Sequence, residues 1–319
     1  MNIQRYLLVF SRIKLQKRLD KTFVWCYYHN YIKHNLVILM NCEDKKMKMM
    51  KKILCAVMAL TMVLALAACG SAKTEAPEAS SDTLVMGTSA DYAPFEFMYP
   101  DDNGDLIYGG IDVSVAQYIA DYMGKDLKVE NMGFDYLLVS LEKGDFDIVI
   151  AAIEENEERS KSADFSDPYY TDYPPMILVK KDNADQYSSL DDFAGKSVGA
   201  QTATTKEGIV KDDMTGANLV SLQNVNDLVN QLVNDKIDAV VLDGAVALQF
   251  VATNDALTVA SVDLGEAAPY RVCVAKGDPK GLLPDINAAI AEMLEKGKVT
   301  EFTEFADSLE DVWQEVSAE

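Results

Sequence analysis

An arginine stands where a buried strand leads into a helix-initiating turn. Residues 144–153 read Gly-Asp-Phe-Asp-Ile-Val-Ile-Ala-Ala-Ile, and this β-branched run is typical of a strand covered on both faces. Asn156 can cap a following helix, which puts Arg159 in its first turn, beside the carboxyl end of the strand. Open α/β sheets bind ligands at that end, and a guanidinium there can hold a carboxylate with two parallel hydrogen bonds. The alternative interpretation is a surface arginine that neutralises the glutamates around it.

The charges divide the chain into two unlike parts. Residues 1–68 hold 12 of the 29 Lys and Arg and 3 of the 51 Asp and Glu, so the remainder has 17 basic against 48 acidic residues, a net charge of −31. Nucleic-acid binding requires a basic face, and we therefore exclude it for this acidic body. Arg159 and Arg271 are the two arginines of the body, which makes a special role for Arg159 more plausible than simple surface charge.

The N-terminal part predicts export and lipid attachment. Lys48, Lys51 and Lys52 precede an apolar stretch of signal-peptide length, which ends in Leu-Ala-Ala before Cys69. We therefore interpret residues 47–68 as a lipoprotein signal peptide and Cys69 as the lipidated cysteine, with an ordinary cleaved signal as the alternative. Residues 69–81 are expected to form the lipidated tether. Residues 1–46 are interpreted as an upstream extension of doubtful translation, or else a cytoplasmic arm.

The cysteines and histidines limit the possible cofactors. Removal of the leader leaves Cys69 and Cys273, and a lipid on Cys69 would preclude an intramolecular disulfide. Both histidines lie in residues 1–46, and the chain has no Cys-x-x-Cys pair. We therefore expect no metal and no cofactor.

The body alternates strand and helix patterns, which predicts an α/β fold of two lobes. Asp243 follows the apolar strand 237–242 and so lies at a strand's carboxyl end. Thr204 or Thr205 can cap the helix that follows residues 197–200 and present hydroxyl and N–H groups to an anion. In the aromatic loop at residues 92–97, we expect Tyr92 to line a pocket and the two phenylalanines to lie in the core.

Several segments appear in an order that is typical of one protein family. Residues 82–319 resemble the bacterial extracellular solute-binding proteins of family 3, which serve ABC importers of polar amino acids. The resemblance rests on Gly-Thr-Ser-Ala-Asp-Tyr-Ala-Pro-Phe-Glu-Phe at 87–97, Gly-Ile-Asp-Val at 110–113, the block from 147 to 159, Asp-Phe-Ser-Asp-Pro-Tyr-Tyr at 164–170, and the segments 198–205, 237–240 and 270–278.

The resemblance implies a periplasmic-binding-protein-like clamp of type II. Lobe 1 would comprise residues 82–170 and 270–319 and lobe 2 residues 171–269, so the chain would cross between the lobes at two hinges. Motif position implies that Arg159 holds the ligand α-carboxylate while Asp243 binds the α-ammonium. The other implied contacts are a sandwich of the ligand side chain between Tyr92 and Phe134, and contacts from Gln201, Thr204, Thr205 and the backbone near Ala151 and Ala152.

Elementary electrostatics agrees with this arrangement, because a zwitterion needs one fixed cation and one fixed anion and neither is cheap to bury alone.

Three positions depart from the family pattern. Glu154 replaces a common threonine or serine donor, so we expect it to point away from the ligand or to face a basic ligand side chain. Ser89 replaces a second ammonium-binding aspartate, with Asp91 nearby. Arg271 replaces a small residue, and strand-edge packing or a surface ion pair is expected for it.

The resemblance implies a monomeric, extracytoplasmic protein, lipid-anchored to the cell membrane. Its ligand would be an amino acid or a related amine-bearing molecule, and its partner the permease of an ABC importer. The alternative is an enzyme on the same fold, of the cyclic amino-acid dehydratase type, in which Glu154 acts as general acid. A ligand-sensing module is a third class, and it would need a separate signalling partner.

Overall fold

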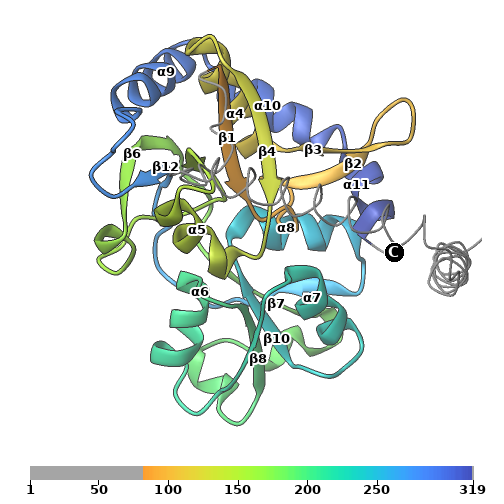
Figure 1. The fold of residues 1–319 in the computed structure, drawn as a ribbon. Helices are drawn as coiled ribbons and strands as arrows, with labels where there is room; N and C mark the ends of the chain where they lie inside the picture. The colour runs from red at the N-terminus through yellow and green to blue at the C-terminus, as the bar shows by residue number, and fades with distance from the viewer. Residues whose placement is uncertain (1–81, 318–319) are drawn as a thin grey trace, which may run out of the picture. The chain divides into compact units, whose positions relative to one another are not determined.

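The computed structural model describes residues 82–317, which belong to one compact unit of the chain. The predicted leader, the lipidation site at Cys69 and the tether therefore lie outside the described residues. Within the described part, the chain forms two five-stranded sheets and one two-stranded hairpin, with helices packed against both larger sheets (Figure 1).

The first sheet has the strand order β4-β1-β5-β12-β6. Strands β4, β1 and β5 are parallel, whereas β12 runs antiparallel to both β5 and β6. The loops that follow β1 and β5 therefore leave the same edge of the sheet. The strands are β1 (Thr83–Thr88), β4 (Asp126–Asn131), β5 (Ile148–Val149), β6 (Ala163–Tyr170) and β12 (Tyr270–Ala275).

Successive residues of this first sheet pack on opposite faces, as a doubly covered strand requires. Met86 and Ile148 join a core with the helices α4 and α9, while Val85 and Val149 join a second core with α5. The helices of this lobe are α4 (Ile111–Tyr122), α5 (Leu137–Lys143), α9 (Leu283–Glu295), α10 (Lys298–Asp307) and α11 (Glu310–Ser317).

Helix α4 begins at a position that only glycine can fill. Gly110 has a φ of 114°, and a Cβ there would lie 2.1 Å from the carbonyl oxygen of Phe95. The close approach lets the aromatic loop pack on the helix, and the N–H groups of Ile111 and Asp112 donate to the carbonyls of Pro94 and Phe95. The hairpin of β2 (Phe97–Pro100) and β3 (Leu106–Gly109) lies between this loop and the helix in the sequence, and Gly104 in its turn has a φ of 83°.

The second sheet has the order β11-β7-β10-β8-β9, in which β10, β8 and β9 are parallel. Alternate residues again face two cores: Val240 packs with α7, and Val241 with the residues that follow α6. Figure 1 shows α6 and α7 flanking this sheet. The elements are β7 (Met176–Lys180), β8 (Ser197–Gln201), α6 (Thr205–Gly208), β9 (Asn218–Leu222), α7 (Val225–Val233), β10 (Ala239–Leu242), α8 (Gly244–Thr253) and β11 (Leu257–Val259).

The two sheets are joined twice, by the segment between β6 and β7 and by the segment between β11 and β12. The second join ends after Pro269, where β12 begins at Tyr270. The helix expected after Asn156 is shorter than the sequence predicts. It is a single 3₁₀ turn, Arg159–Lys161, in which the N–H of Arg159 donates to Asn156 Oδ1 at 2.9 Å.

Candidate functional site

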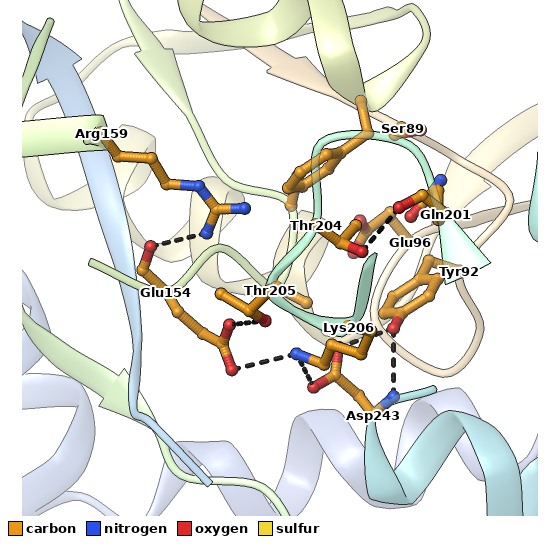
Figure 2. Close-up of a pocket in the computed structure, with 13 residues that line it drawn as sticks. Ser89, Tyr92, Glu96, Glu154, Arg159, Gln201, Thr204, Thr205, Lys206 and Asp243 are labelled. Carbon is orange, nitrogen blue, oxygen red and sulfur yellow. Dashed lines mark hydrogen bonds and ion pairs between the residues drawn. The ribbon is translucent and has the colours of Figure 1, made fainter. Parts of the chain in front are cut away.

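A pocket lies where strand ends from both sheets meet. Its walls come from the loops after β1 and β5 on one side and the ends of β8 and β10 on the other (Figure 2). The lining residues include all ten predicted ligand contacts, which are Tyr92, Phe134, Ala151, Ala152, Glu154, Arg159, Gln201, Thr204, Thr205 and Asp243. The other three lining residues are Ser89, Glu96 and Lys206.

Arg159 enters this pocket from the 3₁₀ turn and is 8% exposed. Its guanidinium donates to two backbone carbonyls, that of Glu154 at 2.7 Å and that of Ala203 at 3.1 Å. It also lies 5.3 Å from the centroid of the Phe134 ring. Among the described residues no carboxylate lies within ion-pair distance of it. A guanidinium has five N–H donors, so this buried cation retains donors for an anion.

Asp243 lies at the end of β10, as the sequence predicts, and is the residue before α8. Tyr92, from the loop after β1, donates its hydroxyl to Asp243 Oδ2 at 2.6 Å. Burial, and then the charge of Asp243, raise the pKa of Tyr92 well above its ordinary value. The phenol therefore keeps its proton and remains a donor to the carboxylate across the pocket.

Lys206 is a charged residue of the pocket that the sequence did not predict. It lies in α6 and is only 3% exposed. Its ammonium bonds to Glu154 Oε1 at 3.0 Å and, more closely, to Asp243 Oδ1, and so joins carboxylates from the two lobes (Figure 2). Burial opposes its charge, but Asp243 and Glu154 outweigh burial and raise the pKa of Lys206. The sequence signal was its position directly after Thr205, in a turn already expected at the ligand.

Glu154 points into the pocket. One carboxylate oxygen accepts a hydrogen bond from the Thr205 hydroxyl and the other accepts from the Lys206 ammonium. The sequence left open whether Glu154 points away from the ligand or faces a basic ligand side chain; in the structure its carboxylate faces the ammonium of Lys206. That cation belongs to the chain itself.

Several expected donors are already engaged within the chain. The N–H of Ala152, at a φ of 45°, donates to Asp112 Oδ2 at 2.6 Å and so does not point to a ligand. Gln201 donates its amide to the carbonyl of Gln223 at 2.9 Å. Thr204 caps α6 by accepting from the N–H of Glu207, while its hydroxyl donates to the carbonyl of Gln201 at 2.7 Å.

A pair of buried carboxyl groups supports the wall behind the pocket. Glu96 lines the pocket and is hydrogen-bonded to Asp112, which also accepts from the Tyr169 hydroxyl at 2.7 Å. Burial raises the pKa of Asp112 to about 6 and that of Glu96 well above its ordinary value. Both shifts favour the protonated form of the pair. No pattern in the sequence predicts that these two residues, 16 positions apart, would meet.

Two of the three departures from the family pattern have simple structural explanations. Ser89 lines the pocket, whereas Asp91 turns away from it and accepts from the N–H of Val225 at 2.8 Å. Arg271 lies 3.4 Å from a carboxylate oxygen of Glu155 and donates to the carbonyl of Ser166 at 2.6 Å. The surface pair expected for Arg271 is thus confirmed.

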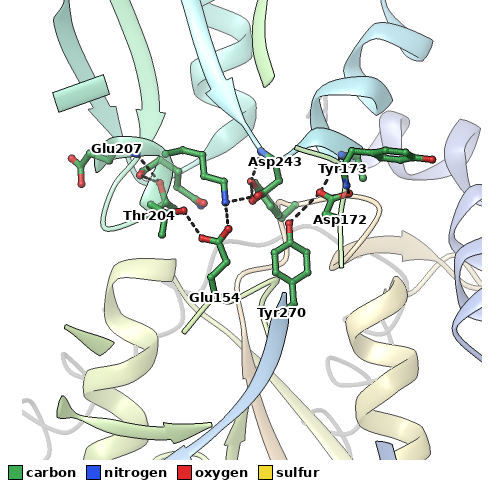
Figure 3. Close-up of polar contacts among 12 residues, drawn as sticks. Glu154, Asp172, Tyr173, Thr204, Glu207, Asp243 and Tyr270 are labelled. Carbon is green, nitrogen blue, oxygen red and sulfur yellow. Dashed lines mark hydrogen bonds and ion pairs between the residues drawn. The ribbon is translucent and has the colours of Figure 1, made fainter. Parts of the chain in front are cut away.

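The carboxylate of Asp172 connects the neighbourhood of the pocket to the segments that join the two sheets. Asp172, between β6 and β7, accepts from the hydroxyl of Tyr270 at 3.1 Å and from the N–H of Ala245 at 3.2 Å (Figure 3). Tyr270 begins β12 and Ala245 lies in the first turn of α8, next to Asp243. The segment between β6 and β7, the start of β12 and the first turn of α8 therefore meet at Asp172.

The space that remains in the pocket is about 10 Å³, close to that needed for one water molecule. An amino acid can reach Arg159 only if the walls separate. Across residues 82–317, no group of three or more histidine, cysteine or acidic side chains is placed to hold a metal ion. No helix in this range is long and apolar enough to span a membrane.

Known proteins are similar to this chain in sequence and in fold. The model of the bacterial extracellular solute-binding proteins, family 3, matches residues 84–304. The arginine-binding extracellular protein ArtP of Bacillus subtilis is 34% identical over 252 residues, which cover 78% of this chain and 95% of that protein. The L-cystine-binding protein TcyJ of Escherichia coli is 33% identical over 226 residues, which cover 70% and 81% of the two chains.

A solved structure extends the similarity to three dimensions. AbpA of Streptococcus pneumoniae, an amino acid ABC transporter substrate-binding protein bound to L-arginine, has a TM-score of 0.69 at 33% identity. The match covers 72% of this chain and 97% of that one. The expected type II periplasmic-binding-protein fold is confirmed. With the family model matching well over half of its length, the chain belongs to the bacterial extracellular solute-binding proteins, family 3.

Proposed function

We propose that this protein captures an amino acid between its two lobes and delivers it to the permease of an ABC importer. The observation that carries the proposal is the charge arrangement of the pocket. Arg159 is a buried cation that bonds only to carbonyls among the described residues, and it shares the pocket with the buried carboxylate of Asp243 on the other lobe. A ligand with a carboxylate and an ammonium complements both groups.

The proposed roles follow from these positions. Arg159 binds the α-carboxylate and Asp243 the α-ammonium, while Tyr92 and Phe134 contact the ligand side chain. Residues 82–170 with 270–319 form one lobe and residues 171–269 the other. Because the two charged ends of the ligand bind to different lobes, the ligand stabilises the closed arrangement only when both ends are present.

The relatives bind ligands of different charge. ArtP is named for arginine, which is cationic, and TcyJ for L-cystine, which has no net charge at neutral pH. Similarity therefore supports an amino-acid ligand without selecting between these classes. The side chains of the pocket must therefore determine whether a cationic ligand or one without net charge binds.

We also propose that Cys69 carries a lipid that anchors the protein to the cell membrane, with residues 69–81 as its tether. The family is extracellular, and the positive, apolar and small-residue pattern before Cys69 is that of a lipoprotein signal. A lipid anchor would keep a monomeric binding protein close to its permease. Replacement of Cys69 by alanine should move the protein from the membrane fraction to the medium, and unchanged membrane retention would contradict the anchor.

Binding without catalysis is the proposed activity. The dehydratase alternative assigns Glu154 as general acid, but Glu154 is ion-paired with Lys206 and accepts a hydrogen bond from Thr205. These contacts suit a carboxylate that holds cations rather than one that delivers a proton to a substrate.

A calorimetric titration series with the twenty amino acids, cystine and simple amines tests the proposal. We expect one or a few amino acids to bind with micromolar affinity, about −8 kcal/mol, and to be recovered unchanged. Absence of binding by every compound would contradict the proposal, as would mass-spectrometric detection of a product from a bound amino acid.

A further inference from the structure

The net charge of the pocket is the sum of the charges of the side chains that line it. Five charged or chargeable side chains line it, and all five are buried: Glu96, Glu154, Arg159, Lys206 and Asp243. Because the walls exclude nearly all water, a charge left without a partner there is costly to maintain. The sum of these charges therefore bears on which ligands the pocket accepts.

Glu96 does not contribute to the net charge of the pocket. Its carboxyl group is fully buried, and burial followed by the charge of Asp112 raises the pKa of Glu96 well above its ordinary value, which favours the uncharged acid. Asp112 also accepts from the N–H of Ala152 and the hydroxyl of Tyr169, so the charge of this pair is stabilised behind the pocket wall. The pocket is left with two cations and two anions.

These four charges cancel. Lys206 accounts for the balance, because without it Glu154 and Asp243 would face Arg159 alone and the pocket would carry a net charge of −1. A zwitterion adds one positive and one negative charge, so every charge in a neutral pocket finds a partner. An amino acid with a cationic side chain would leave one positive charge uncompensated.

Geometry leads to the same result. The Lys206 ammonium lies between Asp243, the carboxylate proposed for the ligand α-ammonium, and Glu154, the carboxylate that could bind a second cation of a ligand (Figure 2). The hydroxyl of Thr205 takes the other oxygen of Glu154. A ligand guanidinium or side-chain ammonium that approached Glu154 would meet a like charge in a dehydrated site, where repulsion is strong.

We propose that Lys206 is a specificity-determining residue that makes the pocket select amino acids of zero net charge and reject those with a cationic side chain. The inference rests on the proposed function, since it names the ligand class of the same pocket. Glu154 and Lys206 act together in it: the chain supplies its own cation where a basic ligand would otherwise bind.

The alternative role for Lys206 is a contact that only holds the lobes together. Such a contact would affect all ligands alike, whereas charge selection affects cationic ligands differently from neutral ones. Three variants separate these roles. Lys206→Gln removes the cation, Lys206→Arg keeps it, and the double variant Glu154→Gln/Lys206→Gln removes one charge of each sign and restores neutrality without leaving a buried carboxylate unpaired.

The test is isothermal titration of the wild type and the three variants with glutamine and cystine as neutral ligands, arginine and lysine as cationic ligands, and glutamate. We expect the wild type and Lys206→Arg to prefer a neutral amino acid. Lys206→Gln should shift the ratio of cationic to neutral affinity in favour of arginine or lysine by on the order of 100-fold, as expected for pairing a buried charge. The double variant should reverse that shift.

Two results would overturn the inference while leaving amino-acid capture intact. One is a wild type that binds arginine or lysine more tightly than every neutral amino acid. The other is a Lys206→Gln variant whose affinities for neutral and cationic ligands change by the same factor. Absence of amino-acid binding by the wild type and by all three variants would reject the proposed function, and the inference with it.

Discussion

Arg159 is unusual among buried cations because its guanidinium donates to backbone carbonyls, those of Glu154 and Ala203, and to no carboxylate in the described part of the chain. Buried charges are normally paired, since desolvation is otherwise uncompensated. The two carbonyls and the Phe134 ring fix the orientation of the guanidinium without neutralising it. A side chain held in this way is preorganised for an external anion, and the α-carboxylate of an amino acid is the anion that we propose.

Removal of the guanidinium should therefore weaken binding strongly. Arg159→Ala is expected to lose about 2–4 kcal/mol of binding free energy in calorimetry, as for truncation of one partner of a buried charge pair. The matched control is Arg271→Ala, which removes the other arginine of the body, part of a surface pair with Glu155, and should leave affinity unchanged. Equal affinities of Arg159→Ala and the wild type would reject the carboxylate role.

The carboxyl pair behind the pocket makes stability depend on pH. Burial raises the pKa of Asp112 from 3.8 to about 6, so the folded state holds a proton that the unfolded state has lost between these values. This contribution to stability is present below pH 3.8 and is lost as the pH rises through about 6.

Asp112→Asn cannot titrate and should lack this dependence. Between pH 4 and pH 7 its free energy of unfolding, relative to the wild type, should rise by up to about 3 kcal/mol. Urea unfolding of both proteins at several pH values measures the difference. A difference that stays constant or falls over this range would contradict the assigned pKa shift.

Some of these residues could be identified from sequence and others could not. Arg159 and Asp243 follow strands with clear apolar patterns, so their positions at the strand ends could be predicted. The contact of Lys206 with Glu154 joins residues 52 positions apart on two lobes, and only the three-dimensional arrangement shows it. Spacing alone also could not show that the N–H of Ala152 is bound to Asp112.

Helix α8 connects the ammonium site to the segments that join the sheets. Asp243 precedes its first residue, Gly244, whose Cα lies close to the segment after β6: a Cβ there would be 2.5 Å from the carbonyl oxygen of Pro174 and from Tyr173 Cβ. The N–H of Ala245 donates to Asp172 in the same segment. The position of Asp243 therefore depends on close packing between α8 and this segment.

Gly244→Ala should disturb that packing. The added methyl group has no space against backbone atoms, so we expect a loss of about 1–3 kcal/mol in unfolding free energy, together with weaker ligand binding. Gly208→Ala is the matched control, because Gly208 is helical, with φ −59° and ψ −46°, and a Cβ there has no heavy atom within 4 Å. Urea unfolding should show that variant to be unchanged or slightly more stable. Similar losses in both variants would contradict a special role for Gly244.

Most elements could be anticipated because apolar periodicity marks them directly, as in α4, where Ile111, Val115 and Ile119 recur at helical spacing and are fully buried. The irregular parts of the chain were harder to predict from the sequence. A single 3₁₀ turn replaces the helix expected at Arg159. The C-terminal helices α10 and α11 were not predicted, although α10 packs against both α4 and α9.

The described molecule is organised so that one pocket holds charges from both lobes in contact. Tyr92 with Asp243, Glu154 with Lys206, and Arg159 with the carbonyl of Ala203 all cross between the lobes. The remaining space is about 10 Å³, so ligand entry requires these contacts to open. Ligand binding and lobe closure then become one coupled equilibrium, in which the ligand replaces contacts that the chain makes with itself.

The most direct test is a crystal structure of the protein with the amino acid that it binds. We predict that the ligand carboxylate accepts hydrogen bonds from the Arg159 guanidinium and that its ammonium lies about 3 Å from a carboxylate oxygen of Asp243. A ligand bound outside this pocket would contradict the proposed capture mechanism. So would a ligand bound within it whose carboxylate lies away from Arg159, with the guanidinium still bonded only to the carbonyls of Glu154 and Ala203.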